Sequence, residues 1–146
     1  MSKYPLSEKD FFDIYSKVPR LCVDLIIKSK EGILLTKRAI DPRKGFWHLP
    51  GGTVFKKEKI SNAILRIAKD ETGLIVMPKK FLGYIEFLNE IRSNVQFHSV
   101  SVAIEVKPTS NNFQPDENSS ELKYFKKLPN KMIKEQKKFL ENCFCY

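Results

Sequence analysis

The sequence predicts an α/β domain, because segments with two different hydrophobic periods alternate along the chain. Short runs in which apolar and polar residues alternate, typical of strands, are interrupted by longer runs with apolar residues three or four apart, typical of helices. The chain has 146 residues, enough for one core without disulfides or a structural metal. We therefore expect a single domain spanning residues 1–146.

The N-terminal third of the chain is expected to form a helix and a hairpin. Ser7 precedes three charged residues, which is a typical helix start, and predicts a short helix over residues 6–18. Residues 21–27 and 33–36 are rich in branched apolar side chains, and the turn Lys30-Glu31-Gly32 lies between them. This pattern predicts two antiparallel strands.

The middle of the chain contains a glycine-rich turn followed by a helix. Residues 46–50 form a short extended piece that ends at Pro50-Gly51-Gly52, a strong turn signal. Residues 60–72 have helical spacing of apolar side chains, and Gly73 follows them. Because glycine readily adopts the left-handed conformation at a helix end, we expect the helix to stop there.

The C-terminal half is expected to contain three strands and a closing helix. Residues 81–87 and 95–106 have the composition of strands, and the second segment alternates clearly. The polar segment 108–120 predicts a long loop, which leads into a short strand over 121–125. Residues 131–144 have one apolar side and predict an amphipathic helix packed on the sheet.

Composition limits the protein classes that need to be considered. No apolar run reaches the roughly 18 residues that a membrane-spanning helix needs, and the first residues do not resemble a secretory signal. Cys22, Cys143 and Cys145 lack the spacing of a zinc site or disulfide scaffold, so we expect reduced thiols. We expect a cytoplasmic protein that does not associate with membranes.

The net charge of +9 suits a ligand rich in phosphate, but it equally suits nucleic acid or a lysine-rich surface. Charge alone therefore does not identify the partner. Many of the lysines lie between residues 123 and 138, away from the glycine-rich turn. We interpret that run as a solvated face.

Glu71 is the residue whose position first indicates chemistry. At about 100° per residue, it falls in the same sector as the apolar stripe of its helix, which consists of Ile60, Ala63, Ile64 and Ile67. An ionised carboxylate aimed at a core needs a partner. The partner is either a structural cation or a metal ion, and the neighbouring glycine turn favours the metal.

Two further features flank this helix. Arg66 and Asp70 are four residues apart and can form an ion pair, whose role is structural in the simplest interpretation. Gly51 and Gly52 allow the backbone to turn tightly, which would expose a carbonyl to a metal and amides to phosphate.

The complete segment resembles the signature of the Nudix hydrolase family. Gly52, Glu58, Arg66, Glu71 and Gly73 occupy the spacing Gly-x5-Glu-x7-Arg-x4-Glu-x-Gly. The resemblance implies an α/β/α sandwich with a mixed β-sheet. It also implies a hydrolase that uses Mg²⁺, with Mn²⁺ as the alternative, to cleave a nucleoside diphosphate linked to another group.

The resemblance also assigns roles to individual residues. The Gly51 carbonyl, Glu71 and Asp70 would hold the metal, although Asp70 is one methylene shorter than the family's glutamate. The arginine that matches Arg66 orients the catalytic loop or faces phosphate. Ile67 stands where most Nudix enzymes have the first metal-binding glutamate, which removes one ligand.

The departure at Ile67 is shared by one subgroup, the GDP-mannose mannosyl hydrolases, which this chain resembles over several segments. These are residues 6–14, Asp24, Lys37-Arg38, Gly45-Phe46-Trp47 and Pro115-Asp116-Glu117. The resemblance implies that Arg38 and Arg66 contact phosphate, that Lys37 lies in the substrate site, and that Asp24 contacts the sugar. It also implies a homodimer.

The late loop departs from that subgroup. The subgroup has a Gln-His pair there that supplies a metal ligand and the general base, whereas this chain has Asn118 and Ser119. A serine cannot act as a base near neutral pH. Either Glu117 or Glu121 takes the role of base, or the attack shifts from the sugar carbon to phosphorus, as in pyrophosphatases of the ADP-ribose type.

Three alternatives stay open. His98 is interpreted as a hydrogen-bonded structural histidine in a strand, with a substrate contact as the second interpretation. The absent histidine and Ile67 also allow a nucleotide-binding module that has lost turnover. A nucleic-acid-processing enzyme rests on charge alone, so we do not expect a nucleic-acid partner.

Overall fold

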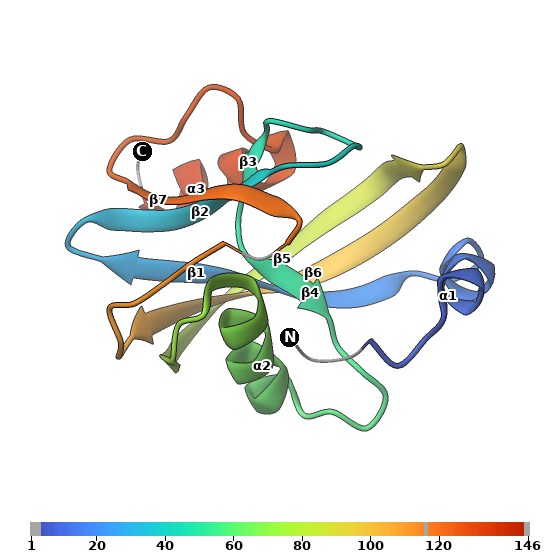
Figure 1. Cartoon of the computed structure of the whole chain (residues 1–146), viewed down its shortest axis with the longest axis horizontal. Coiled ribbons are helices and arrows are strands. Elements are labelled where there is room, and N and C mark those ends of the chain that lie inside the picture. Colours follow the sequence, from blue (N-terminus) through green and yellow to red (C-terminus); the bar gives the residue numbers. More distant parts are fainter. Residues whose placement is uncertain (1–3, 116, 145–146) are drawn as a thin grey trace.

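The computed structural model describes residues 4–115 and 117–144 (Figure 1). Asp116 and Cys145 lie outside this range. In chain order the elements are α1 (Glu8–Tyr15), β1 (Arg20–Ser29), β2 (Gly32–Arg38), β3 (Trp47–His48), β4 (Gly51–Thr53), α2 (Ile60–Thr72), β5 (Val76–Arg92), β6 (Val95–Pro108), β7 (Ser119–Phe125) and α3 (Lys134–Phe144).

The strands form one mixed sheet, as predicted. The main path runs β3-β2-β1-β6-β5, with β4 paired to β1 and β7 paired to β2. The β1–β6 pair is parallel, and the other pairs are antiparallel. The predicted hairpin of β1 and β2 is confirmed, but it is short, because only Lys28 and Ser29 of β1 pair with β2.

Beyond this short hairpin the two strands separate. Residues 20–27 of β1 pair with β4 and β6, whereas β2 pairs with β3 and β7. The sheet therefore has the shape of a fork, with the β1–β2 hairpin at its closed end. Asp24 on β1 and Arg38 at the end of β2 lie in the walls of the same hollow, at the open end of this fork.

Helices α2 and α3 cover separate hydrophobic cores, which confirms the predicted sandwich. Ile64 and Ile67 of α2 pack with alternate β1 residues such as Leu25 in one core. Leu140 of α3 packs with the intervening residue Ile26 in the other core. Because neighbouring residues of a strand point to opposite faces, β1 is buried from both sides.

Helix α2 has the predicted bounds, but its buried stripe differs from the prediction. Gly73 caps it in the left-handed conformation with φ 74°. Ile60 is 39% exposed, whereas Ala68 and Thr72 are buried. The stripe is thus rotated away from the first turn, and Glu71 lies at its edge, half-buried.

Other boundaries also need correction. Helix α1 is shorter than the predicted 6–18. The Gly51-Gly52 turn is the start of strand β4, and β5 extends well beyond the predicted 81–87 in both directions. No helix in the described ranges is long and apolar enough to cross a membrane.

Candidate active site

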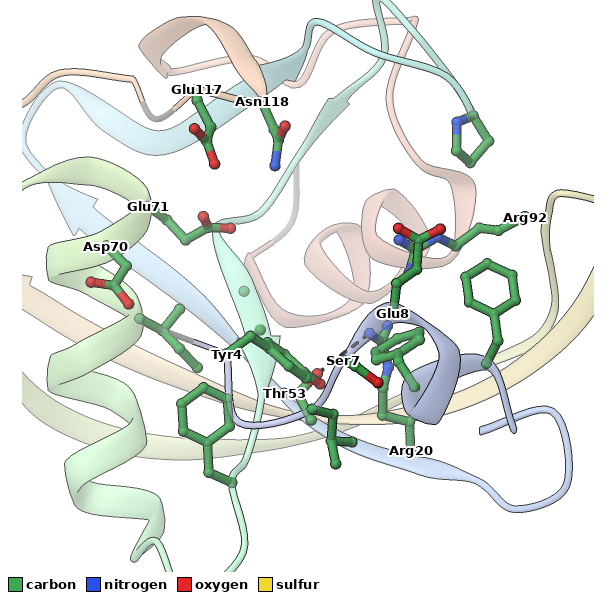
Figure 2. A pocket seen from close by; sticks show the side chains of 18 of the residues that line it. Tyr4, Ser7, Glu8, Arg20, Thr53, Asp70, Glu71, Arg92, Glu117 and Asn118 are labelled. Carbon is green, nitrogen blue, oxygen red and sulfur yellow. Dashed lines mark hydrogen bonds between the residues drawn. The ribbon is translucent and has the colours of Figure 1, made fainter. Parts of the chain in front are cut away.

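A cleft with two connected lobes lies between α1, the end of α2 and the loop before β7 (Figure 2). The large lobe has a volume of about 950 Å³, and the small lobe, which reaches into the fork of the sheet, about 320 Å³. The residues that line both are Arg20, Pro42, Gly51, Gly52, Glu71, Ile91, Arg92 and Asn118.

One wall of the cleft is made by β4 and the C-terminal end of α2. Gly51 pairs with Asp24 of β1, and a Cβ atom at Gly51 would collide with the Asp24 carboxylate and approach the Val23 carbonyl to 2.8 Å. Glycine is therefore required where the backbone passes this strand. Glu71 extends from α2 into the cleft beside it (Figure 2).

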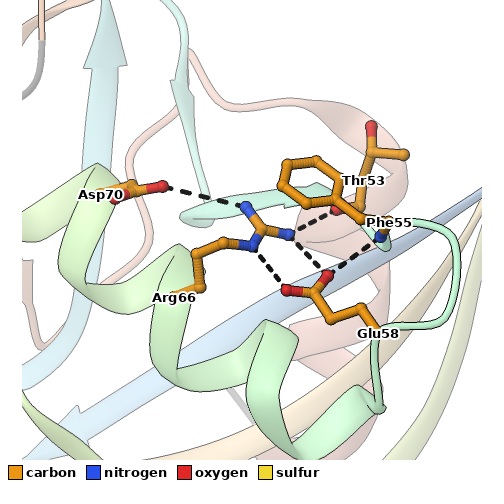
Figure 3. Close-up of polar contacts among 5 residues, drawn as sticks. All are labelled: Thr53, Phe55, Glu58, Arg66 and Asp70. Carbon is orange, nitrogen blue, oxygen red and sulfur yellow. Dashed lines mark hydrogen bonds and ion pairs between the residues drawn. The ribbon is translucent and has the colours of Figure 1, made fainter. Parts of the chain in front are cut away.

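The Glu58–Arg66 pair ties the loop after β4 to α2 (Figure 3). Arg66 Nε donates to Glu58 Oε2 at 2.7 Å, and Nη2 donates to Glu58 Oε1 at 3.0 Å and to the Thr53 carbonyl at 2.8 Å. The Phe55 amide donates to the same carboxylate at 2.9 Å. The Phe55 ring stacks on the guanidinium, with 3.7 Å between its centroid and Arg66 Cζ.

Through these contacts Arg66 joins α2 to the loop after β4. The predicted ion pair with Asp70 is present but long, at 3.9 Å. The strongest hydrogen bonds of Arg66 go to the loop, and they hold the pKa of Glu58 below its ordinary value. Arg66 thus fixes the backbone that carries the glycine strand.

Asp24 is the buried carboxyl of the small lobe. It is 6% exposed, and Gln136 Nε2 of α3 donates to its Oδ2 at 3.0 Å. Burial raises the pKa of Asp24 to about 6, while hydrogen bonds from Gln136 and Ser101 oppose that rise. Near neutral pH the folded protein therefore holds a costly carboxylate at this position.

Replacing Asp24 with asparagine is expected to stabilise the protein at high pH. A raised folded-state pKa gives stability that is present below pH 4 and is lost as pH rises through about 6. Asp24→Asn should therefore gain about 2 kcal/mol of unfolding free energy at pH 8 and nothing at pH 4. Thermal unfolding of both proteins from pH 4 to 8 measures this; an equal change at both ends would contradict it.

The opposite wall is made by the loop before β7 and the loop after β2. Glu117 lines the large lobe, and Asn118 lines both lobes (Figure 2). The Ala39 amide donates to the Asn118 carbonyl at 2.9 Å, which joins the two loops. Arg38 lines the small lobe, and its Nε donates to the Pro42 carbonyl at 2.7 Å.

The cleft brings together seven of the predicted site residues, namely Asp24, Arg38, Gly51, Arg66, Asp70, Glu71 and Glu117. Three others line neither lobe. Glu121 pairs with Lys37 across β2 and β7, with Lys37 Nζ 5.7 Å from the Trp47 ring centroid. His98 lies in a separate hollow beside Lys17, and among the described residues its buried Nε2 has no hydrogen-bond partner.

The end of the cleft formed by Arg20, Glu90 and Arg92 was not predicted from the sequence. Arg20 opens β1, and the other two lie near the end of β5. Arg20 Nη2 is 4.0 Å from Glu90 Oε1, and the Ser99 hydroxyl donates to that oxygen at 2.7 Å. No motif connects these residues, because the β1–β6–β5 pairing alone brings them together.

Ile67, the departure from the family pattern, is 1% exposed and belongs to the core under α2. A Cβ atom at Gly52 would lie 3.3 Å from Ile67 Cγ1. The isoleucine thus packs under the glycine strand and supplies no ligand atom there. The carboxylates at this wall are those of Asp70 and Glu71.

The structure is thus an α/β/α sandwich with a cleft lined by carboxylates and arginines. The NUDIX domain family matches residues 18–143, and the chain belongs to this family and is a Nudix hydrolase.

Several individual proteins are similar to this chain in sequence or in structure. The chain is 36% identical over 115 residues to the low-salt glycan biosynthesis protein Agl8 of Haloferax volcanii, covering 77% of this chain and 74% of that protein. It is 46% identical over 65 residues to an ADP-ribose pyrophosphatase of Methanocaldococcus jannaschii, covering 44% of this chain but only 38% of the relative. A crystal structure of a MutT NUDIX hydrolase from Burkholderia pseudomallei superposes with a TM-score of 0.74 at 26% identity, covering 85% and 97% of the two chains.

Proposed function

We propose that the protein hydrolyses a nucleoside diphosphate linked to a sugar or a similar group, with Mg²⁺ as cofactor. The observation that carries this proposal is the cleft, where Glu71 and Gly51 face Glu117 and Asn118 across the large lobe. Arginines from separate elements, including Arg38, line the same cleft. Such a cleft offers binding groups to both a divalent cation and a diphosphate.

The donor atoms of this wall fit Mg²⁺ or Mn²⁺. These ions prefer oxygen ligands, and Mg²⁺ needs one or two carboxylates together with waters and substrate oxygens. Glu71 and the Gly51 carbonyl supply such atoms, with Asp70 beside them. The metal would supply Lewis-acid activation of a phosphoryl oxygen.

Glu117 is the better of the two proposed bases. It lines the large lobe, whereas Glu121 lies on β7 outside both lobes. A general base must reach the proton that it removes, so position is the first criterion. Glu117 would accept a proton from the attacking water, while Arg38 balances the charge of the diphosphate and Asp24 contacts the group in the small lobe.

Two cleavage sites are compatible with this cleft. The resemblance to GDP-mannose mannosyl hydrolases and the glycan-biosynthesis relative support a sugar-linked substrate. Glu117 in place of a histidine base, together with the ADP-ribose pyrophosphatase relative, supports attack at phosphorus. We therefore keep the pyrophosphatase as the second candidate.

Product analysis separates the candidates. The protein is incubated with GDP-mannose, ADP-ribose and dinucleoside polyphosphates, with and without Mg²⁺, in ¹⁸O-labelled water. Free sugar carrying the label, with intact nucleoside diphosphate, indicates attack at the sugar carbon. Labelled nucleoside monophosphate or sugar phosphate indicates a pyrophosphatase. If none is turned over with either metal, the proposed function is wrong and a nucleotide-binding module remains.

We further propose a homodimer joined along the outer edge of β5. This strand is 17 residues long and lies at the end of the main sheet path. Phe81 and Tyr84 are each 62% exposed, and their partners on β6, Ile104 and Val102, point to the same face. A long apolar edge strand favours pairing with a second strand.

Charged substitutions on this edge are expected to separate the dimer. Phe81→Lys combined with Tyr84→Lys places like charges where two copies would meet, so sedimentation should change from a dimer to a monomer. Leu65→Lys is the matched control, because Leu65 is an exposed apolar residue on α2. A wild-type protein that sediments as a monomer would contradict the proposal.

A further inference from the structure

Arg92 stands out among the arginines of the cleft because its guanidinium packs on aromatic rings and makes no hydrogen bond to a described residue. It lines both lobes. It lies over the rings of Phe11 and Phe12, at 5.2 Å and 5.9 Å from their centroids. Among the described residues it forms no hydrogen bond or ion pair. Its donors are therefore available to a molecule in the cleft.

The neighbouring Arg20 is held in place by several polar groups. Its Nε donates to the Ser99 hydroxyl at 3.3 Å and its Nη1 donates to the Thr53 hydroxyl at 3.4 Å. Arg20 also lies over the Phe11 ring, which Arg92 contacts too, with 5.2 Å between Arg20 Cζ and the ring centroid. Two guanidiniums thus share one aromatic ring.

Arg20 and Arg92 place two positive charges at this end of the cleft, and Glu8 and Glu90 are acidic side chains that interact with Arg92 electrostatically. Glu90 Oε1 lies 4.0 Å from Arg20 Nη2. Burial, followed by repulsion from Arg20, lowers the pKa of Arg92. A bound anion would reduce the repulsion between the two guanidiniums and would accept hydrogen bonds from Arg92.

This end of the cleft is separate from the wall of β4 and α2, where Gly51 and Glu71 lie. Figure 2 shows Glu71 and Arg92 entering the cleft from opposite sides. Glu71 comes from α2, whereas Arg92 comes from the end of β5 and rests on α1. A substrate whose diphosphate lies at Glu71 and Arg38 would direct another part toward Arg92.

We propose that Arg92, supported on Phe11 and Phe12, binds an anionic group, a carboxylate or a phosphate, on the moiety linked to the nucleoside diphosphate. The planar fork of arginine matches both groups with two parallel hydrogen bonds. The proposal rests on the proposed function and narrows it, because it selects acidic over neutral linked groups.

Matched pairs of ligands test this without turnover. Binding of UDP-glucose and UDP-glucuronate, and of GDP-mannose and GDP-mannuronate, is measured by titration calorimetry in EDTA. Each pair differs by one carboxylate. The wild type should bind the acidic member about tenfold more tightly, as one charge-assisted contact provides. Arg92→Gln should remove this preference and change the binding of the neutral member less than about twofold.

Two variants serve as controls. Arg92→Lys keeps the charge and loses the fork, so it should retain only part of the preference. Lys80→Gln removes an exposed charge elsewhere on β5 and should leave all four affinities unchanged. The preference of the wild type for the acidic ligands is measured without any variant. It therefore tests the proposal even if a variant does not fold.

The remaining outcomes overturn the proposal in distinguishable ways. If Arg92→Gln lowered the affinity for the acidic and the neutral ligand of a pair equally, Arg92 would instead hold the diphosphate. Equal affinities in the wild type would reject the acidic preference while leaving the proposed function intact. Failure to bind any of the four, together with no Mg²⁺-dependent turnover, would reject the proposed function as well.

Discussion

Glu71→Gln is expected to reduce Mg²⁺-dependent turnover by about 100-fold or more, with the fold intact. Glutamine keeps the shape of the side chain but removes the charge that would attract a divalent cation. Loss of a metal contact removes several kcal/mol of transition-state stabilisation, and about 1.4 kcal/mol corresponds to each factor of ten. Steady-state rates over a range of Mg²⁺ concentrations provide the measurement.

Asp70→Asn is the matched control for this prediction. Asp70 is the neighbouring carboxylate on α2, it also lines the large lobe, and its side chain lies 3.9 Å from Arg66. We expect a smaller reduction, because Glu71 lines both lobes and Asp70 only one. If Asp70→Asn were the more damaging change, Asp70 and not Glu71 would be the principal ligand.

Arg66→Met is expected to destabilise the protein by about 3 kcal/mol, because the Glu58 carboxylate would be left largely buried without its cation. For a chain of this size the melting temperature should fall by roughly 9 °C. Methionine keeps an apolar stem against Phe55. Lys69→Met, which removes an exposed charge from the same helix, should change the melting temperature little.

The destabilisation by Arg66→Met should depend on pH. Hydrogen bonds from Arg66 lower the pKa of Glu58 in the folded protein. A lowered pKa gives stability that is present above the unfolded value of about 4.3 and is lost as pH falls through the folded value. The difference in melting temperature between the two proteins should therefore narrow below about pH 4. A difference that stayed constant to pH 3 would assign the effect to packing instead.

The features that the sequence predicted well are local ones. Helix α2 and its glycine cap follow from residues within one segment, and the spacing from Gly52 to Gly73 placed Glu71 at the cleft. The length of β5 could not be predicted, because its pairing with β6 shifts register three times. Each shift interrupts the alternation by which a strand is identified.

The sequence alone also could not decide whether Glu117 or Glu121 is the better candidate for the general base. Both lie near the start of β7, and only the path of the loop shows that the first faces the large lobe. The Arg20–Arg92 end was missed for a related reason. Arg20 and Arg92 are 72 positions apart in the chain, and strand pairing brings them together.

The two ends of the cleft differ in how they are encoded. The wall proposed to bind the metal comes from one continuous stretch of sequence, from Gly51 to Gly73. The end around Arg92 is assembled from α1, the start of β1 and the tip of the β5–β6 hairpin. Substitutions at these scattered positions would therefore change the Arg92 end while leaving the residues of the Gly51–Gly73 segment as they are.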